Sequence, residues 1–367
     1  MKKFAAILFS FLILGLISFN YQKGFVITGH VTGFTDGTKI SIINFSTEDT
    51  IETTTISNNK FVFKGFLKDE PEEVMVIAKT DNPFTVTCIL IGNEDVTIRG
   101  DIKDFQRSLT ISGSRFQDDY TKMNSVTRRF DLATDSLSQW FMKLPLDQRQ
   151  KQNDFFNKLG VLSHTRDSLR LSYAKANLNT YPALIELFNR KARLPKDTLR
   201  TLFHKLSANL KASKYGKALE VYLNAKIPEI GDPYLNFEGY TKNNEKIRLS
   251  DIKGKYILLD FTAAYCGACV LSGPELRKIA KTYNDSLTIV SFSSDAKKEI
   301  WLKALQRDSV TWTSIWDGKG VYSDTYIKYG IKAIPSFFLI DPNGKIVDKW
   351  LGYYNGWLEE KLKRFKK

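Results

Sequence analysis

Residues 255–275 read KYILLDFTAAYCGACVLSGPE. The opening run, 256–261, is apolar except for Asp260, which is typical of a strand buried on both faces of a mostly parallel sheet. Cys266 and Cys269 follow three positions apart, so in a helix that begins there both sulfurs lie in the first turn and close together. The stretch therefore predicts a central strand, followed by a dithiol that can cycle between two thiols and a disulfide.

The two cysteines differ in their place on the predicted helix. At a helix N-terminus, unpaired backbone N–H groups and the positive end of the helix dipole stabilise a thiolate and lower its pKa below the value of about 8.5 for a free thiol. Cys266 lies nearer to this end, so we expect it to attack substrates. Cys269 lies further inside the helix and is predicted to resolve the mixed disulfide.

The surroundings of the dithiol resemble the active site of thioredoxins. Asp260 precedes the first cysteine by six residues, where many thioredoxins carry a buried acid that takes up and returns the proton of the resolving thiol. Pro274 stands where thioredoxins have a helix-kinking proline, and residues 333–336, AIPS, resemble the cis-proline loop that faces the dithiol. The resemblance implies a C-terminal α/β thioredoxin fold in which Asp260 relays protons, and Ile334 and Pro335 bind the substrate.

Four positions depart from the family pattern. Tyr265 replaces the usual tryptophan before the first cysteine, and we expect its ring to cover the disulfide and contact substrates. Ala268 replaces a proline inside the motif, which weakens any inference about redox potential. Ser272 replaces an acid that cytochrome c maturation reductases usually carry, so a dedicated apocytochrome reductase is not supported. Ser291 stands where a lysine often pairs with the buried acid, which leaves Asp260 without that partner.

Other readings of the dithiol fit the sequence less well. A zinc site needs two further ligands, and the remaining cysteine and histidines lie far upstream in other segments, so no metal is predicted. A static disulfide across so short a loop would add little stability. Asp260 as a mere core acid would be expensive in an apolar strand without a partner or a chemical role. No cofactor is expected beyond the Cys266–Cys269 disulfide itself.

Residues 1–22 are predicted to be a signal peptide or an N-terminal membrane anchor. Lys2 and Lys3 precede an uncharged apolar run over 4–19, which is long for a signal peptide and short for a membrane span. Both alternatives predict export to the periplasm or cell envelope, and the second predicts association with the inner membrane. Export also suits the dithiol, which in an oxidising compartment needs a redox role to avoid remaining a disulfide.

Residues 24–112 are predicted to form an all-β sandwich. Short alternating strands are separated by turn residues such as Asp36-Gly37 and Asn58-Asn59. The pattern resembles the β domain of unassigned function that precedes thioredoxin-like domains in some Gram-negative envelope proteins. Cys88 lies on the same strand face as Phe84, Val86 and Leu90, so we expect a buried structural thiol in the core of this domain.

Residues 113–226 are predicted to be a helical segment. Apolar residues recur there at spacings of three and four. The segment holds 21 basic and 10 acidic residues, a difference of +11 in a chain whose net charge is +14. Such a surface could meet anionic lipid or acidic partners, or it could be a solvated face. An exported chain without a binding motif is not expected to bind nucleic acid.

Residues 227–367 complete the thioredoxin-like domain. Residues 227–232 and 249–255 resemble the lead-in hairpin of the TlpA/ResA-like branch of the family. A parallel strand is expected over 287–292 and a helix over 297–306. The turn Asp341-Pro342-Asn343-Gly344 is expected to join strands over 337–340 and 345–350.

These features predict an exported thiol–disulfide oxidoreductase. Cys266 attacks a substrate disulfide, Cys269 resolves it, Asp260 relays the proton, and the Ile334 backbone beside Pro335 pairs with the substrate strand. Family analogy favours reduction of disulfide-containing envelope proteins, which requires a membrane electron donor.

Two alternatives to this function remain open. One is a scaffold or binding protein with a vestigial dithiol. The other is a peroxiredoxin-type peroxidase, although that chemistry places a threonine three residues before the reactive cysteine, with a proline before the threonine. Here Thr262 lies four residues before Cys266, and the proline is absent.

Overall fold

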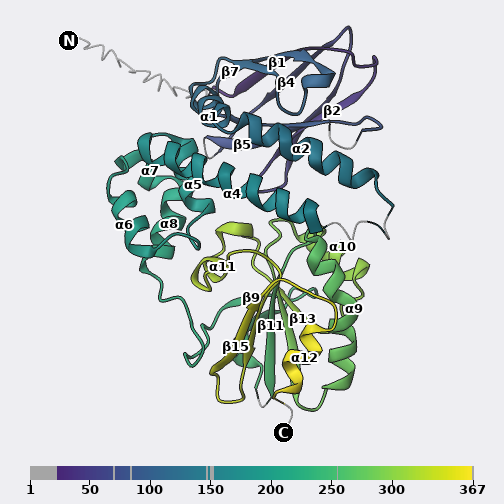
Figure 1. Ribbon diagram of the computed structural model, residues 1–367, viewed down its shortest axis with the longest axis vertical. Helices are drawn as coiled ribbons and strands as arrows, with labels where there is room; N and C mark the ends of the chain where they lie inside the picture. The colour runs from purple at the N-terminus through teal and green to yellow at the C-terminus, as the bar shows by residue number, and fades with distance from the viewer. Residues whose placement is uncertain are drawn as a thin grey trace, which may run out of the picture.

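The computed structural model describes residues 23–68, 71–82, 85–145, 148, 153–253 and 255–365. Figure 1 shows a β-sandwich at one end of the molecule, an α/β domain at the other, and helices between them and along one side. The predicted signal peptide or anchor at 1–22 lies outside the described residues. Within the described ranges, no helix combines the length and apolar character needed to cross a membrane.

The β-sandwich consists of two four-stranded sheets, and it confirms the predicted all-β domain. One sheet has the order β4-β1-β7-β8 and the other β3-β2-β5-β6. Inward-facing apolar side chains from both sheets form one core, because alternate residues of a strand point to opposite faces. The elements are β1 (Phe25–Thr32), β2 (Lys39–Asn44), β3 (Thr50–Thr55), β4 (Lys60–Gly65), β5 (Glu72–Ala78), β6 (Val86–Ile91), β7 (Asp95–Asp101), the 3-10 turn η1 (Ile102–Asp104) and β8 (Thr110–Ser112).

Cys88 is not part of this core, so the prediction of a buried structural thiol was wrong. Ile89 on β6 faces the core, whereas Cys88 and Leu90 point to the outer side of the sheet. Leu90 is buried there against the helices, but Cys88 is exposed. The sequence placed Cys88 and Leu90 on a common face correctly, and that face is covered by the helical segment rather than by the second sheet. Phe84 lies outside the described residues.

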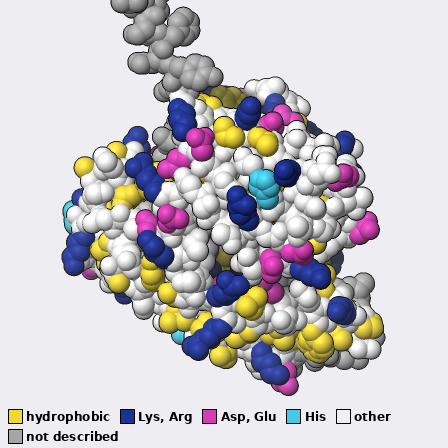
Figure 2. All heavy atoms as spheres, turned by 90° about the horizontal axis from the view of Figure 1, so that it is seen from above, with side chains coloured by type: hydrophobic (Ala, Val, Ile, Leu, Met, Phe, Trp, Pro, Cys, Tyr) yellow, Lys and Arg dark blue, Asp and Glu magenta, His cyan; other side chains and the backbone are white. Residues whose placement is uncertain are grey.

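The helical segment packs on the outer face of the β3-β2-β5-β6 sheet. Helix α1 lies against β6, and apolar residues of α5 belong to the same core cluster as Leu90. Side-chain caps mark the start of two of these helices: the Ser114 hydroxyl accepts from the N–H of Gln117, and Thr180 caps a helix with Pro182 in its first turn. On the face drawn in Figure 2, basic side chains are scattered among acidic ones and form no single patch. The helices are α1 (Arg115–Ser125), α2 (Arg128–Lys143), α4 (Asn153–Ala176), α5 (Tyr181–Asn189), α6 (Lys196–His204), α7 (Ala208–Ala212) and α8 (Lys214–Asn224).

The C-terminal domain has the predicted thioredoxin-like α/β fold. Its seven-stranded sheet has the order β10-β9-β13-β12-β11-β14-β15, with β11, β12 and β13 parallel and β14 antiparallel to β11. Helices α9 and α12 cover one face of this sheet. The expected lead-in hairpin is present, but its strands lie between the two stretches that suggested it, at β9 (Glu238–Tyr240) and β10 (Lys246–Arg248).

The remaining elements of this domain follow in chain order. They are η2 (Leu249–Asp251), β11 (Tyr256–Thr262), α9 (Gly267–Thr282), β12 (Leu287–Ser293), α10 (Lys298–Arg307), β13 (Thr313–Trp316), η3 (Gly320–Tyr322), α11 (Asp324–Lys328), β14 (Ser336–Ile340), β15 (Ile346–Leu351) and α12 (Trp357–Lys363).

The turn between β2 and β3 brings the sandwich into contact with the thioredoxin-like domain. Asp49 forms an ion pair with Lys297 at 3.0 Å, and the hydroxyls of Ser46 and Tyr322 are 3.2 Å apart. Lys297 lies at the start of α10, in the segment that follows β12. The sandwich therefore lies against the end of the domain at which the parallel strands finish.

Candidate active site

The two cysteines of the motif form a disulfide at the start of α9. Cys266 is the N-cap residue, and its sulfur accepts the backbone N–H of Cys269 at 3.1 Å. Cys266 is half-buried, whereas only 8% of Cys269 is exposed. Because an attacking sulfur must be reached by its substrate, this difference in exposure favours Cys266 as the nucleophile of the reduced protein.

Asp260 lies in the centre of the sheet, on the strand that leads to the disulfide. It belongs to β11, between β12 and β14, and only 3% of it is exposed. Its Oδ2 accepts the hydroxyl of Ser291 at 3.0 Å, and Oδ1 is buried without a hydrogen-bond partner in the described part of the chain. Burial raises the pKa of Asp260 to about 7, and the Ser291 hydrogen bond opposes this shift. A carboxyl group that titrates near neutral pH can both accept and return a proton.

Ser291 therefore supplies a partner where the sequence comparison with thioredoxins suggested that Asp260 had lost one. The Ser291 oxygen in turn accepts the indole N–H of Trp312 at 2.8 Å. Because that N–H takes an acceptor site of the hydroxyl, the hydroxyl proton is directed to Asp260. This pair fixes the orientation of the carboxyl group from one side and leaves Oδ1 available on the other.

A small cavity connects Asp260 with the dithiol. It has a volume of about 40 Å³ and is lined by Asp260, Cys269 and Ser291 among others. A bound water molecule needs a cavity volume of roughly 10–15 Å³ and polar hydrogen-bond partners, so this cavity has room for a water molecule. A proton can therefore travel between the Cys269 sulfur and Asp260 through a water molecule rather than by direct contact.

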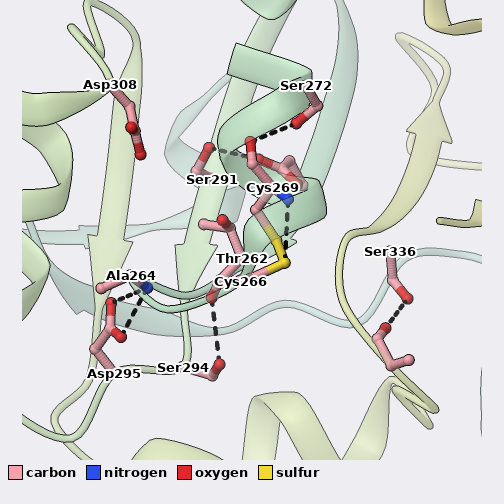
Figure 3. Close-up of a disulfide and its surroundings, with 12 residues drawn as sticks. Thr262, Ala264, Cys266, Cys269, Ser272, Ser291, Ser294, Asp295, Asp308 and Ser336 are labelled. Carbon is pink, nitrogen blue, oxygen red and sulfur yellow. Dashed lines mark hydrogen bonds between the residues drawn. A yellow bond between two sulfur atoms is a disulfide. The ribbon is translucent and has the colours of Figure 1, made fainter. Parts of the chain in front are cut away.

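Asp295 is a second buried acid in this cavity, and the sequence analysis missed it. Its carboxylate accepts the backbone N–H of Ala264 at 2.9 Å and the hydroxyl of Ser293 at 2.7 Å. Arg307 donates to the carbonyl of Ala264 at 2.8 Å, so both backbone groups of this residue are held. Figure 3 shows Asp295 beside Ala264, on the loop that leads to Cys266.

The sequence contained a signal for Asp295. It stands two residues after β12, the strand beside β11, and the carboxyl ends of neighbouring parallel strands meet at one edge of a sheet. Burial raises the pKa of Asp295, and its hydrogen bonds with Ala264 and Ser293 oppose the shift. We interpret Asp295 as a positioning residue, because its contacts are to the loop and not to a sulfur.

The loop before β14 lies on the other side of the disulfide, as the position of Ser336 in Figure 3 shows. The Ile334–Pro335 peptide bond is cis. In the described part of the chain, neither backbone group of Ile334 forms a hydrogen bond, although Pro335 accepts the N–H of Gly352 at 2.8 Å. The backbone of Ile334 is thus available to a partner.

Tyr265 is the remaining predicted site residue. Its side chain is 78% exposed, so most of its surface is open to a partner. The structure thus brings Cys269 and Asp260 to one cavity, with Cys266 bonded to Cys269, Tyr265 next to Cys266 in the chain and the Ile334 loop on the opposite side.

Comparisons with known proteins match the two ends of the chain separately. Residues 230–349 match the AhpC/TSA family, and residues 25–120 match a domain of unknown function, DUF4369. The chain is 32% identical over 120 residues to the thioredoxin-like protein YneN of Bacillus subtilis, an alignment that covers 32% of this chain and 68% of YneN. It is 29% identical over 127 residues to the thiol-disulfide oxidoreductase ResA of Bacillus cereus, covering 34% of this chain and 70% of ResA.

Among solved structures, one similar chain is the crystallised thioredoxin domain of a thiol-disulfide oxidoreductase from Bacteroides vulgatus. It is 31% identical, with a TM-score of 0.36, and the match covers 38% of this chain and 99% of that one.

Proposed function

The chain belongs to the thioredoxin-like thiol–disulfide oxidoreductases related to YneN and ResA, and on this basis we propose that it is exported and reduces disulfide bonds of cell-envelope proteins. One observation carries the proposal. A half-buried Cys266 at a helix N-terminus forms a disulfide with buried Cys269, and Cys269 and Asp260 line the same cavity. The lysines and apolar run of residues 1–22 support export.

The reduced protein starts the reaction. The Cys266 thiolate, stabilised by the N-terminus of α9, attacks one sulfur of a substrate disulfide. A bond forms between Cys266 and that sulfur, the substrate disulfide breaks, and the other substrate sulfur leaves as a thiolate that takes up a proton. The product is a mixed disulfide.

Resolution needs the second sulfur and a base. The Cys269 thiol gives its proton to ionised Asp260 through the small cavity and attacks Cys266. The bond between Cys266 and the substrate sulfur breaks, that sulfur leaves as a thiolate that takes up a proton, and the Cys266–Cys269 disulfide forms. Two electrons have passed to the substrate, so each cycle requires a two-electron donor that reduces the disulfide again. We assign that role to a membrane thiol donor, because an exported protein is separated from cytoplasmic reductants.

The surface around Cys266 suits an extended peptide segment. The free backbone groups of Ile334 can pair with a substrate strand, and the exposed ring of Tyr265 can pack on its side chains. Main-chain pairing tolerates many sequences, so this arrangement fits an enzyme with several protein substrates.

Trapping experiments test the assignment of the two sulfurs. Cys269→Ser should attack substrates but fail to release them, and it should accumulate as mixed disulfides on non-reducing gels. Cys266→Ser lacks the exposed nucleophile and should trap nothing. Both variants are made with Cys88→Ser, because Cys88 is an exposed free thiol that could form adducts of its own.

Three outcomes would contradict the proposal. Trapping by Cys266→Ser alone would exchange the roles of the sulfurs. Trapping by neither variant would favour a scaffold with a vestigial dithiol. Turnover of hydrogen peroxide faster than reduction of insulin disulfides would favour a peroxidase.

A further inference from the structure

A second, larger cavity lies between the β-sandwich and the helical segment. Its volume is about 650 Å³, within the roughly 300–1,000 Å³ range of small-molecule sites. The outer face of the sheet forms one wall through β5 and β6, and α1, α2, α4 and α5 form the other. Figure 1 shows β5 beside these helices. Among the described residues, none from the thioredoxin-like domain lines it, so it is separate from the dithiol site.

One part of the cavity wall is a fixed ion-pair cluster. Glu186, which is buried, accepts hydrogen bonds from Arg170 at 2.9 Å and from Arg190. Arg170 also donates to Asn124 at 2.8 Å, and Arg190 pairs with Asp167 at 2.9 Å. Because their donors are already engaged, Arg170 and Arg190 provide a rigid support rather than free binding groups.

Three other arginines of the cavity have N–H groups without a close acceptor among the described residues. Arg166 lies 3.9 Å from Asp131 and 3.5 Å from Asp167, distances longer than a good hydrogen bond. Arg193 lies 3.9 Å from Asp167. Arg128 donates to the Ser108 hydroxyl at 2.8 Å and forms no ion pair in the part of the chain that the structure describes. A planar guanidinium with unused N–H groups is the side chain best suited to bind a carboxylate or phosphate.

The charges of the cavity do not cancel. Among the residues that the structure describes, six arginines line it, against the four carboxyl groups of Glu73, Asp131, Asp167 and Glu186. Asp135 does not line the cavity, but it forms an ion pair with Arg107 and is counted as a fifth carboxyl group. At least one positive charge is therefore left over. Burial raises the pKa of Glu73, which favours its neutral form and increases the excess.

We propose that this cavity binds a small organic anion through its carboxylate or phosphate groups, with Arg128, Arg166 and Arg193 as the binding side chains. A volume of about 650 Å³ suits a small molecule, and the ion pairs around Glu186 fix part of the cavity wall. The site would give the β-sandwich and the helices a function that is independent of disulfide exchange.

Cys88 provides a reporter inside this cavity. It is one of three cysteines in the chain, and the other two form the disulfide, so the oxidised protein has a single free thiol. Cys88 is exposed to the cavity that it lines, although desolvation by the surrounding cavity walls raises its pKa and slows its reaction. The rate at which neutral iodoacetamide alkylates Cys88, followed by mass spectrometry, therefore reports whether the cavity is occupied.

The experiment compares citrate, inorganic phosphate and sodium chloride at equal ionic strength, with the full oxidised chain. An anion that fills the cavity at ten times its dissociation constant leaves about one site in eleven empty, so alkylation should slow about elevenfold. Protection by citrate alone would identify carboxylate recognition, protection by phosphate alone would identify phosphate recognition, and both results support the proposal.

Charge-neutral variants test the binding side chains. Arg166→Gln and Arg193→Gln should each raise the anion concentration needed for half-protection by about tenfold or more, since each loses a charge-assisted hydrogen bond. Arg115→Gln is the control, because Arg115 is 80% exposed beside the cavity wall and does not line it. Arg193, which is 57% exposed, can be changed with little risk to folding if Arg166→Gln lowers the melting temperature.

The proposal would be overturned if citrate and phosphate protect Cys88 no better than chloride. It would also be overturned if Arg166→Gln and Arg193→Gln are protected at the same concentrations as the unaltered protein. Neither result depends on turnover of the dithiol, so failure here leaves the oxidoreductase activity untouched.

Discussion

Replacing Asp260 with Asn tests the proton relay most directly. The substitution keeps the size of the side chain and removes its ability to accept a proton from Cys269. We expect attack by Cys266 to continue and resolution by Cys269 to slow, because only the second step needs this base.

The size of the effect follows from the pKa of Asp260, which is about 7. Its ionised fraction is then about one tenth at pH 6, one half at pH 7 and nine tenths at pH 8. A positioned general base contributes about 10²-fold or more to a rate. Taking the lower figure, Asp260→Asn should slow resolution by about tenfold at pH 6, about 50-fold at pH 7 and about 90-fold at pH 8.

A chromogenic aryl disulfide separates the two steps in a stopped-flow experiment. The first equivalent of aryl thiolate leaves when Cys266 attacks, and the second leaves when Cys269 resolves the mixed disulfide. The assay uses a Cys88→Ser background, and Cys269→Ser is the control that must lose the second phase. Equal rates and pH profiles for the second phase with and without the Asp260→Asn substitution, between pH 6 and 8, would refute the relay.

Stability provides an independent check that the variant is folded. The folded pKa of about 7 lies above the unfolded value of 3.8, so ionisation destabilises the native state as pH rises from about 4 to above 7. A shift of about three pKa units corresponds to about 4 kcal/mol at pH 8. An unpaired Asn amide costs about 1–3 kcal/mol, so Asp260→Asn should raise the free energy of unfolding by about 1–3 kcal/mol at pH 8 and lose this gain near pH 4.

Two further substitutions probe the partners of the site. Ser291→Ala removes the hydroxyl that lowers the pKa of Asp260, so the pH at which the second phase reaches half its maximum rate should move above 7; an unchanged or lower midpoint would contradict this reasoning. Asp295→Ala leaves the buried N–H of Ala264 unpaired at a cost of about 1–3 kcal/mol and should slow the first phase, while the pH profile of the second phase stays the same. Asp295→Asn retains an acceptor oxygen and should restore most of the first-phase rate; a shifted second-phase profile in either variant would instead make Asp295 part of the relay.

The thioredoxin-like fold could be predicted because its signals are local. An apolar run with one acid predicted the central strand β11, and a C-x-x-C after it predicted the helix that begins at Gly267. The turn at 341–344 predicted the hairpin of β14 and β15. Each of these depends on residues close together in the chain, where spacing and turn chemistry decide the structure.

The partners within the site could not be predicted in the same way. Asp295 reaches Ala264 from 31 positions away, and Ser291 reaches Asp260 across the same separation. These contacts depend on the parallel register of β11 and β12, which no local pattern specifies. The sequence identified Asp260 as an acid whose burial costs free energy. Only the register of the two strands showed that the Ser291 hydroxyl donates a hydrogen bond to it.

Cys88 shows what the sequence alone determined and what only the tertiary structure decided. Alternation along β6 determined that Cys88 and Leu90 share a face, because side chains in a strand have a period of two. Which of the two faces meets the sandwich core depends on packing with distant strands and helices. In the folded chain the helices bury Leu90 and leave Cys88 in an arginine-lined cavity, because both faces of this sheet are covered by different layers.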